Sequence, residues 1–500
     1  MKANEKAKLC AVFPALGEAE RGLCRELEEK CAVEIDPRET RHQGKDAVDY
    51  AIQCDPDFSV SEEESNAVLR HINDGAFDGL ILFPGYFDRR FYLTGRPMLI
   101  VDTLPSLQLG FKNAMALARQ YERPFITATW NRSDTDVSES VSQARQDALR
   151  SKIKLFGALQ SIKRTRIMDV QVKGFGVEPH EHWWRLNQEE YLHALKNSLG
   201  TEVRIVDYRD LFRRYLQVDS LEAGDIAEVW LKRAQPTRAG RNTRNKGEAT
   251  KEEVLKAALL YVAARDMMRE SACNAVTMDA TTWACAVGKS FAKSIGEKFL
   301  VSGSLGLTEF RLHGVPACCQ SDMESLVTLI IGEAVTQRPG FHGDFVVDCF
   351  NRVGQIGHCN APINPYGDER RAPYSIGGEP TRRPQVYVDL PEEGPVTVIK
   401  VNLLKKEISL WGGDLVPGGT IYKNFDESYC CTKLVVRTNA ASILENYAYR
   451  TFGNHNCLFY GDFRNQIRTI AALLGFTVIE QDRQGISGFR DTQGDDRTLR

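Results

Sequence analysis

Short apolar runs alternate with amphipathic stretches along the first 165 residues, and this alternation restricts the possible folds more than any other feature of the chain. The apolar runs are bounded by glycine, proline or aspartate. Such runs are typical of strands that are buried on both faces, so together with the helical stretches they predict parallel βαβ units. The expected strands are residues 9–13, 79–84, 97–102 and 125–130, and the expected helices are 18–31, 61–72, 110–121 and 137–162.

A second α/β region is expected to begin near residue 166. Residues 170–175 and 202–208 have strand character, and a helix at 187–199 is expected to end at Gly200. A further helix at 250–273 begins with Thr250 followed three residues later by Glu253, which is the pattern of a capping box. No glycine-rich phosphate loop occurs, because residues 302–306 lack the spacing of a dinucleotide-binding turn.

The pattern changes after about residue 340. Residues 385–390, 396–401 and 407–410 are short, β-branched and separated by turn residues, which indicates antiparallel strands. A helix at 462–474 and a strand at 476–480 are expected to close the chain. The expected fold class is therefore α/β, with two N-terminal α/β domains of flavodoxin-like or Rossmann-like type at 1–165 and 166–340. A C-terminal β-rich domain with a closing helix is expected at 341–500.

Composition excludes several classes of protein. The 64 basic and 67 acidic residues give a formal charge of −3, which provides no basic face for nucleic acid. The longest apolar runs, such as 255–264 and 325–331, fall short of the roughly 20 residues that span a bilayer. The 13 cysteines include no C-x-x-C pair, so we expect reduced cysteines and a cytoplasmic location.

Three segments carry polar residues that an apolar setting does not explain. They are residues 318–324 at an expected strand-to-helix junction, residues 341–345, and residues 453–456. Ligands in α/β proteins tend to lie at the carboxyl ends of strands, where such a junction occurs. The residues alone leave other readings open: His342-Gly343-Asp344 and Asn454-His455-Asn456 could be turns, and His358 could be a core histidine.

At these three segments the chain resembles the L-fucose isomerase family and, more distantly, the L-arabinose isomerases. The resemblance is carried by residues 199–234, by the run from Cys319-Gln320-Ser321-Asp322 to Asp344, and by Gly453-Asn454-His455 with the helix that follows. Such isomerases bind a divalent cation, typically Mn²⁺, that polarises the carbonyl of an open-chain sugar while carboxylates move a proton through an enediol. The resemblance implies that Asp344, His455 and the residue at position 320 are the metal ligands.

Position 320 departs from the family, which has a glutamate there. The amide of Gln320 can coordinate a cation but cannot take up a proton. Asp322 is the nearest replacement for the missing base, and Asp279 is a second, because its segment resembles a substrate-facing strand of the family. The resemblance also implies substrate contacts at His342, His358, Asn454 and Trp283.

Several functions fit this pattern. The first is a manganese-dependent aldose–ketose isomerase that acts on a free monosaccharide. The second is another sugar enzyme on the same scaffold, either an epimerase or a glycoside hydrolase that uses two carboxylates from Asp279, Asp322 and Asp344. The third is a catalytically reduced sugar-binding or regulatory protein that has kept the fold. Because members of the family form trimers or hexamers, the resemblance also implies a homo-oligomer with active sites near subunit interfaces.

Overall fold

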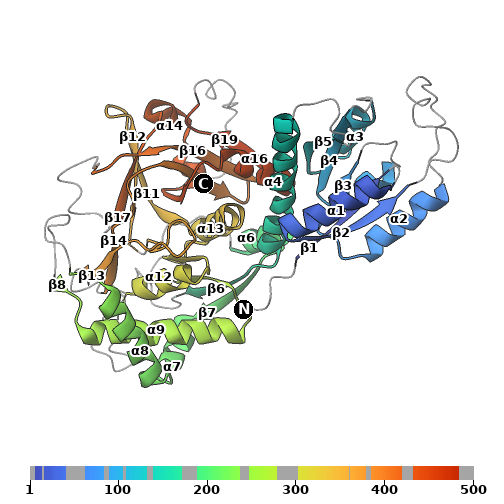
Figure 1. The fold of residues 1–500 in the computed structure, drawn as a ribbon. Helices are drawn as coiled ribbons and strands as arrows, with labels where there is room; N and C mark the ends of the chain where they lie inside the picture. The colour runs from blue at the N-terminus through green and yellow to red at the C-terminus, as the bar shows by residue number, and fades with distance from the viewer. Residues whose placement is uncertain are drawn as a thin grey trace, which may run out of the picture. The chain divides into compact units, whose positions relative to one another are not determined.

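The computed structural model divides the chain into two compact units, which are described separately here (Figure 1). The first unit holds residues 1–163 and 465–477, and the second holds 164–464 and 478–500. The expected boundary at 340 does not separate two units, because residues on both sides of it belong to the second unit. The structure describes residues 6–13, 16–40, 62–83, 89–104, 109–131, 139–171, 188–236, 247–278, 302–359, 361–378, 384–418 and 432–483.

The first unit contains a parallel five-stranded sheet with the strand order β2-β1-β3-β4-β5. This is one of the common orders of doubly wound α/β sheets. The expected helices and strands of this region are confirmed, with bounds that agree to within a few residues. The strands are β1 (Ala7–Phe13), β2 (Val33–Glu39), β3 (Gly79–Leu82), β4 (Met98–Leu104) and β5 (Phe125–Asn131), and the α-helices are α1 (Glu18–Cys31), α2 (Glu62–Asp74), α3 (Leu109–Gln120) and α4 (Glu139–Lys163).

Strand β2 is absent from the sequence-based prediction. Its sequence, VEIDPRE, contains four charged residues and Pro37. It pairs in parallel with β1 and forms an edge of the sheet. An edge strand faces solvent on one side, so it tolerates charge and a proline that the centre of a sheet would exclude. Hydrophobic periodicity therefore gave no signal for it.

The second unit begins with a parallel four-stranded sheet in the order β10-β9-β6-β7. Its helix α9 (Lys251–Glu270) starts with the expected capping box between Thr250 and Glu253. Gly200 ends the preceding helical segment with φ 70°, a left-handed conformation that favours glycine. The strands are β6 (Arg166–Gln171), β7 (Glu202–Asp207), β9 (Ala275–Met278) and β10 (Ala317–Cys319), and the other α-helices are α6 (Gln188–Ala194), α7 (Tyr208–Tyr215), α8 (Ser220–Arg233) and α12 (Ser304–Leu312).

The C-terminal part of the second unit is the expected antiparallel β-region. Six of its strands pair in the cyclic order β15-β18-β11-β12-β17-β16, and a further pairing between β15 and β16 closes the ring into a barrel-like sheet. A seventh strand, β19, extends it beside β16. The strands are β11 (Phe341–Asp348), β12 (Val353–His358), β15 (Pro395–Asn402), β16 (Glu407–Leu415), β17 (Thr432–Arg437), β18 (His455–Tyr460) and β19 (Thr477–Glu480).

Three short strands and three α-helices remain among the residues that the structure describes. A separate sheet has the strand order β14-β13-β8, and β13 pairs antiparallel with both neighbours. None of the helices among the described residues is long and apolar enough to cross a membrane. The remaining elements are β8 (Gly247–Glu248), β13 (Tyr374–Gly378), β14 (Gln385–Val388), α14 (Ala440–Asn446), α15 (Tyr449–Phe452) and α16 (Arg464–Leu474).

Helix α13 (Met323–Thr336) packs against β15 and β18 of the barrel-like sheet and against β9 and β10 of the parallel sheet, and thereby joins the two larger sheets of the second unit. Gly332 allows this close contact, since a Cβ atom there would lie 2.1 Å from Cζ of Phe459. We expect Gly332→Ala to lower the free energy of unfolding by about 2 kcal/mol, because overpacking forces the ring or the helix to shift.

Gly224 in α8 is a matched control, because a Cβ atom there meets nothing within 4 Å. Replacing this helical glycine with alanine is expected to raise the free energy of unfolding by about 0.5–1 kcal/mol. Urea unfolding of both variants tests the packing of α13. Equal effects at the two positions would show that α13 does not pack closely against Phe459.

Candidate metal centre

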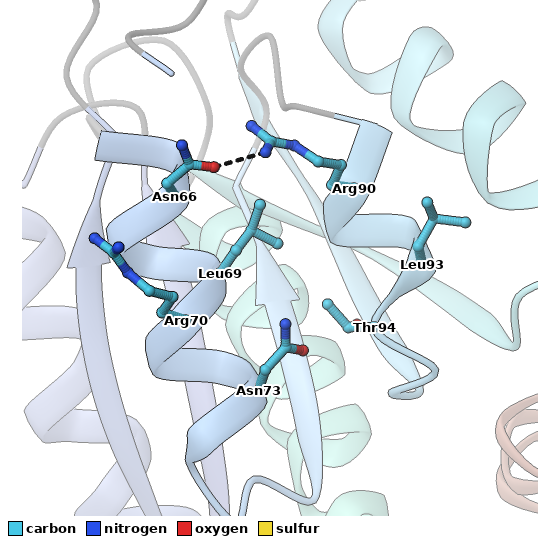
Figure 2. Close-up of a pocket in the computed structure, with 7 residues that line it drawn as sticks. All are labelled: Asn66, Leu69, Arg70, Asn73, Arg90, Leu93 and Thr94. Atoms are coloured by element: carbon cyan, nitrogen blue, oxygen red, sulfur yellow. Dashed lines mark hydrogen bonds between the residues drawn. The ribbon is translucent and has the colours of Figure 1, made fainter. Parts of the chain in front are cut away.

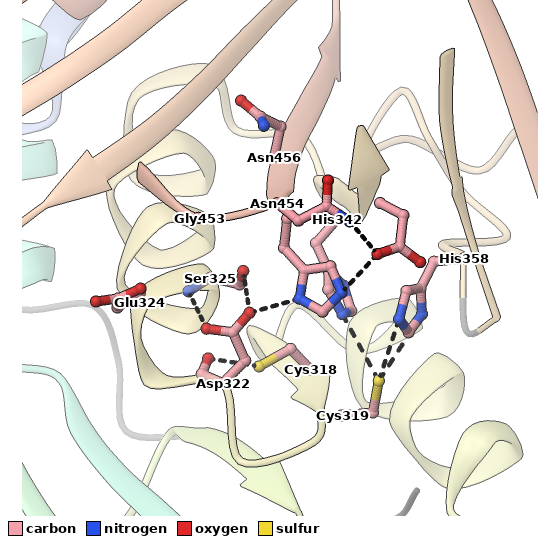
Figure 3. Close-up of polar contacts among 12 residues, drawn as sticks. Cys318, Cys319, Asp322, Glu324, Ser325, His342, His358, Gly453, Asn454 and Asn456 are labelled. Carbon is pink, nitrogen blue, oxygen red and sulfur yellow. Dashed lines mark hydrogen bonds and ion pairs between the residues drawn. The ribbon is translucent and has the colours of Figure 1, made fainter. Parts of the chain in front are cut away.

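Four strands of the second unit bring polar side chains to one place (Figure 3). Strand β10 ends at Cys319, β11 carries His342 and Asp344, β12 ends at His358, and β18 begins at His455. Asp344 and His455 are direct neighbours across the antiparallel pair of β11 and β18. The cluster therefore lies where the carboxyl end of the parallel sheet meets the barrel-like sheet.

The alternative that these segments are turns is wrong except at Asn454, which lies in a bend just before β18. Residues 341–345 lie within β11, and His455 and Asn456 lie within β18. Gly343 allows β11 to lie close to β12, since a Cβ atom there would lie 2.7 Å from the carbonyl oxygen of Gly357 on β12. The His-Gly-Asp sequence thus places two polar side chains on one face of a strand, with the small residue between them facing the neighbour.

The turn between β10 and α13 is backbone-strained. Gln320 and Ser321 have φ values of 67° and 55°, both in the left-handed region. Two successive non-glycine residues in this region cost on the order of 1 kcal/mol each, and such strain is concentrated at functional sites. The turn is held by the buried hydroxyl of Ser321, which donates a hydrogen bond to Asp169. It positions Asp322 as the N-cap of α13.

Asp322 acts inside the protein rather than at a surface. Its side chain is 1% exposed, and its Oδ1 accepts a hydrogen bond of 2.9 Å from the backbone N–H of Ser325. Its Oδ2 lies 2.5 Å from the Ser325 hydroxyl and 2.7 Å from Nδ1 of His455. Because Lys400 donates to the Ser325 hydroxyl over 3.0 Å, that hydroxyl donates its own hydrogen to Asp322. Asp322 is therefore an acceptor throughout, and Nδ1 of His455 carries a hydrogen.

The hydrogen bond from Nδ1 of His455 to Asp322 determines which ring nitrogen of His455 carries the hydrogen. With its hydrogen on Nδ1, the neutral imidazole has no hydrogen on Nε2, which lies 3.4 Å from Oδ1 of Asp344. A carboxylate that holds one nitrogen of a histidine while the other nitrogen binds a metal is a recurrent arrangement in metal sites. Asp322 is thus a positioning residue for His455.

The other two histidines have opposite hydrogen positions. Nδ1 of His358 lies 3.0 Å from the carbonyl oxygen of Cys359, which only accepts, so Nδ1 donates and Nε2 carries no hydrogen. In His342 the partner of Nδ1 is Nη2 of Arg311 at 2.6 Å, which only donates. Nδ1 of His342 therefore accepts, and its Nε2 carries the hydrogen.

Arg311 is fully buried and fixed in place. Its side chain has 0% exposure, and its Nε donates to the carbonyl oxygen of Ala317 over 2.7 Å. Burial, reinforced by the nearby Arg311 charge, lowers the pKa of His342, so this histidine stays neutral. Arg311 thus keeps His342 as a hydrogen-bond donor through Nε2, a form that cannot coordinate a cation.

Two groups of side chains in the described part of the chain have the proximity for a metal ion. Their ligand atoms lie within 4.8 Å of one another, and the groups are Asp344, His358 and His455, and Cys319, His342 and His358. The hydrogen positions favour the first group, because in their neutral forms both of its imidazoles have a hydrogen-free Nε2. In the second group His342 is a donor. Moreover, Sγ of Cys319 is nearly equidistant from the two nitrogens of His358, at 3.8 and 3.7 Å, and so does not lie along the axis of Nε2.

The electrostatics of the first group link its members. For Asp344, burial raises the pKa, but the hydrogen bond and charge of His455 outweigh it, and the net pKa is lowered. For His455, burial lowers the pKa, but the hydrogen bonds to Asp322 and Asp344 outweigh it, and the net pKa is raised. A proton on Nε2 of His455 and a cation compete for the same nitrogen, so the chemistry of this donor set fits a cation.

Glu324 is a second buried acid near the centre, at 7% exposure. Burial raises the pKa of its carboxyl to about 7, opposed by Lys400 and aided by Asp322. Since the folded state then holds the proton more tightly than the unfolded chain, the stability of the protein falls as the pH rises from about 4.5 to about 7.

We therefore expect Glu324→Gln to be more stable than the original chain at pH 8, by about 2 kcal/mol, and about equal to it near pH 4.5. The amide removes the cost of a buried charge without changing the shape of the side chain. Urea unfolding at the two pH values measures the difference. A difference in stability that does not change with pH would contradict the raised pKa.

The structure brings together most of the residues that the sequence put forward. Asp322, Asp344 and His455 are joined as described, and Nδ2 of Asn454 donates to Asp344 over 2.7 Å. His342 and His358 have ring centroids 4.7 Å apart. Gln320 is half-buried and makes no hydrogen bond to another described residue. Asp279 and Trp283 lie outside the described residues.

Sequence reasoning missed Arg311 and Lys400. Arg311 stands in helix α12 with the spacing of an ordinary helical arginine, and Lys400 alternates with apolar residues in β15. Both are at most 2% exposed. Neither segment shows a signal that could have indicated their burial, because their partners come from other elements.

Comparisons with known proteins give no match from which a function could be assigned. No model of a protein family matches this chain, and no curated protein matches it either.

Proposed function

We propose that this chain is a divalent-metal-dependent aldose–ketose isomerase of the L-fucose isomerase type, acting on a free monosaccharide. One observation carries the proposal: Asp344, His358 and His455 converge within 4.8 Å, with hydrogen positions that leave both histidines in the form that binds a metal. A carboxylate with two imidazoles suits Mn²⁺ and neighbouring divalent metals. The resemblance in sequence supplies the substrate class.

His358 takes a different part from the one expected of it. The resemblance implies a substrate contact for His358 and a ligand role for Gln320, whereas the geometry supports His358 as the third ligand. The family's glutamate is thereby replaced by an imidazole from another strand. When bound, the cation would supply polarisation of the sugar carbonyl and stabilisation of the negative charge that develops on it.

The residues around the proposed ligands have separate tasks. Asp344 is the most accessible of the three ligands, with 24% of its side chain exposed, so we propose that substrate approaches from its side. Asn454 holds Asp344 in orientation through its amide. His342 presents an N–H from Nε2, which we propose donates to a substrate oxygen. Asp322 and Ser325 fix His455 from behind.

The base of the reaction is not Gln320, since an amide takes up no proton. Asp322 is 1% exposed, and both of its oxygens accept hydrogen bonds within the protein. Of the carboxylates put forward by the sequence, we propose Asp279 as the proton-transfer group. In the sequence it comes directly after β9, a strand of the parallel sheet that pairs with β10. A glycoside hydrolase needs two carboxylates that reach the substrate. The burial of Asp322 leaves only Asp279 and Asp344 for that role, and Asp344 is already a proposed metal ligand.

The experiment is a screen of free aldoses and ketoses with the Mn²⁺-loaded chain, beside a screen of aryl glycosides. We expect isomerisation of at least one free sugar and no glycoside hydrolysis. Asp279→Asn is expected to lower kcat by at least about 100-fold while the cation stays bound, because it removes only the base. Glycoside turnover without isomerisation, or full activity of Asp279→Asn, would contradict the proposal.

The resemblance also leads us to propose a homo-oligomer, either a trimer or a hexamer. Sedimentation equilibrium of the purified chain measures its mass directly. A mass of one chain at all concentrations would contradict this part of the proposal.

A further inference from the structure

The first unit contains a cavity that is separate from the metal centre (Figure 2). Its volume is about 450 Å³, which is within the range of sites for small molecules. One wall comes from α2 and the other from the short helix η2 (Arg89–Leu93) and the residue after it. The lining residues are Asn66, Leu69, Arg70 and Asn73 on α2, and Arg90, Leu93 and Thr94 on the other wall.

The spacing of these residues makes the cavity a groove between two helical faces. Positions 66, 69, 70 and 73 have the spacing i, i+3, i+4 and i+7, which places them on one side of α2. Positions 90, 93 and 94 have the same spacing opposite them. In Figure 2, Arg90 reaches across the groove to α2, where its Nη1 donates to Oδ1 of Asn66 over 2.6 Å.

The polar lining is cationic and rich in donors. Among the lining residues that the structure describes, two are arginines, which stay charged at every working pH, and none is an aspartate or glutamate. Because Oδ1 of Asn66 accepts from Arg90, the part of that amide left to a ligand is its N–H₂ group. Asn73 adds a second amide. Such a lining attracts an anion with several acceptor oxygens.

The apolar lining indicates that the anion has an organic body. Leu69 is 7% exposed and forms the floor of the groove, whereas Leu93 is 51% exposed at its rim. This exposed leucine lies on the same wall as Arg90, which gives an apolar surface next to a cationic one. Inorganic ions alone would not use that surface.

We propose that this groove binds a small phosphorylated organic molecule through its phosphate monoester. A phosphate monoester is close to dianionic at neutral pH and presents three acceptor oxygens, which matches two guanidinium groups and two amides better than the two oxygens of a carboxylate do. The site is independent of the metal centre and of the isomerase proposal.

The test is calorimetric titration of the full chain after removal of divalent cations, so that the metal centre does not contribute. The probes are glucose 6-phosphate, inorganic phosphate, gluconate and glucose. We expect saturable binding of one glucose 6-phosphate per chain, weaker binding of inorganic phosphate, and none of glucose. Binding should weaken as salt is added, because it depends on charge. Tighter binding of gluconate than of glucose 6-phosphate would overturn the phosphate assignment.

Substitutions locate the binding in the groove. Arg70→Gln and Arg90→Gln are each expected to weaken glucose 6-phosphate binding by about tenfold or more, since each removes charge-assisted hydrogen bonds. Arg70 is exposed on α2, so this variant is expected to fold even if Arg90→Gln does not. Arg21→Gln on α1 is the matched control and should bind as the original chain does. No saturable binding, or equal affinity in Arg70→Gln and Arg21→Gln, would overturn the proposal.

Discussion

Replacing His358 with alanine is expected to lower the affinity of the chain for Mn²⁺ by more than about 100-fold. His358 provides one of the two imidazoles with a hydrogen-free Nε2, because its Nδ1 donates to the carbonyl of Cys359. Loss of a direct ligand should exceed the roughly 10–100-fold loss caused by removing residues that only orient ligands. Isomerase activity should fall with the bound metal. Titration of the cation-depleted variant with Mn²⁺ measures the change.

His342 is the matched control for this prediction. It is also a fully buried histidine, on the neighbouring strand, with its ring centroid 4.7 Å from that of His358. Because Arg311 donates to its Nδ1, His342 is not a ligand, and His342→Ala should bind Mn²⁺ within about tenfold of the original chain. The kcat is expected to fall, since a proposed substrate contact is lost. Equal losses of metal affinity in the two variants would contradict the assigned hydrogen positions.

Asp322→Asn is expected to have the second large effect. The amide keeps the shape of the side chain but not its charge, and so it no longer orients and stabilises the imidazole of His455. The variant should bind Mn²⁺ about 10–100-fold more weakly. It should also lose about 3 kcal/mol of stability, because it breaks a buried charge network that includes Lys400, which lies 4.0 Å from Oδ1 of Asp322.

The control for Asp322→Asn is Asp414→Asn, on an exposed position of β16. This variant should match the original chain in metal affinity and in urea unfolding to within about 0.5 kcal/mol. If Asp322→Asn keeps the metal affinity of the control, then Asp322 does not position His455. Direct contact of Asp322 with substrate would instead raise KM without any change in metal affinity.

Much of the fold could be predicted from the sequence because local signals and tertiary structure agree. The helix at 18–31 and the capping box at Thr250 were found at their positions, as was the glycine that ends a helix at 200. Strand β2 was missed because an edge strand does not require the apolar residues that a central strand does. The closure of six strands into a ring depends on pairings between distant segments, such as β15 with β18, which no local pattern encodes.

Part of the candidate site could also be predicted from local sequence signals. The three polar segments were recognisable because each holds its residues close together in sequence. The expectation that the three segments form one site came from the resemblance to the L-fucose isomerase family, which covers all three. The choice of ligands was not, since it depends on which nitrogen of each histidine carries the hydrogen. That is set by Cys359, Arg311 and Asp322, whose partners lie up to 133 positions away in the sequence.

The most direct test of this account is the metal content of the chain after titration with Mn²⁺, measured beside the variant Asp344→Ala. We expect one tightly bound cation per chain in the original protein and none in the variant, with both folded. A well-folded original chain that binds no divalent cation would contradict the central claim, and so would a variant that binds as tightly as the original.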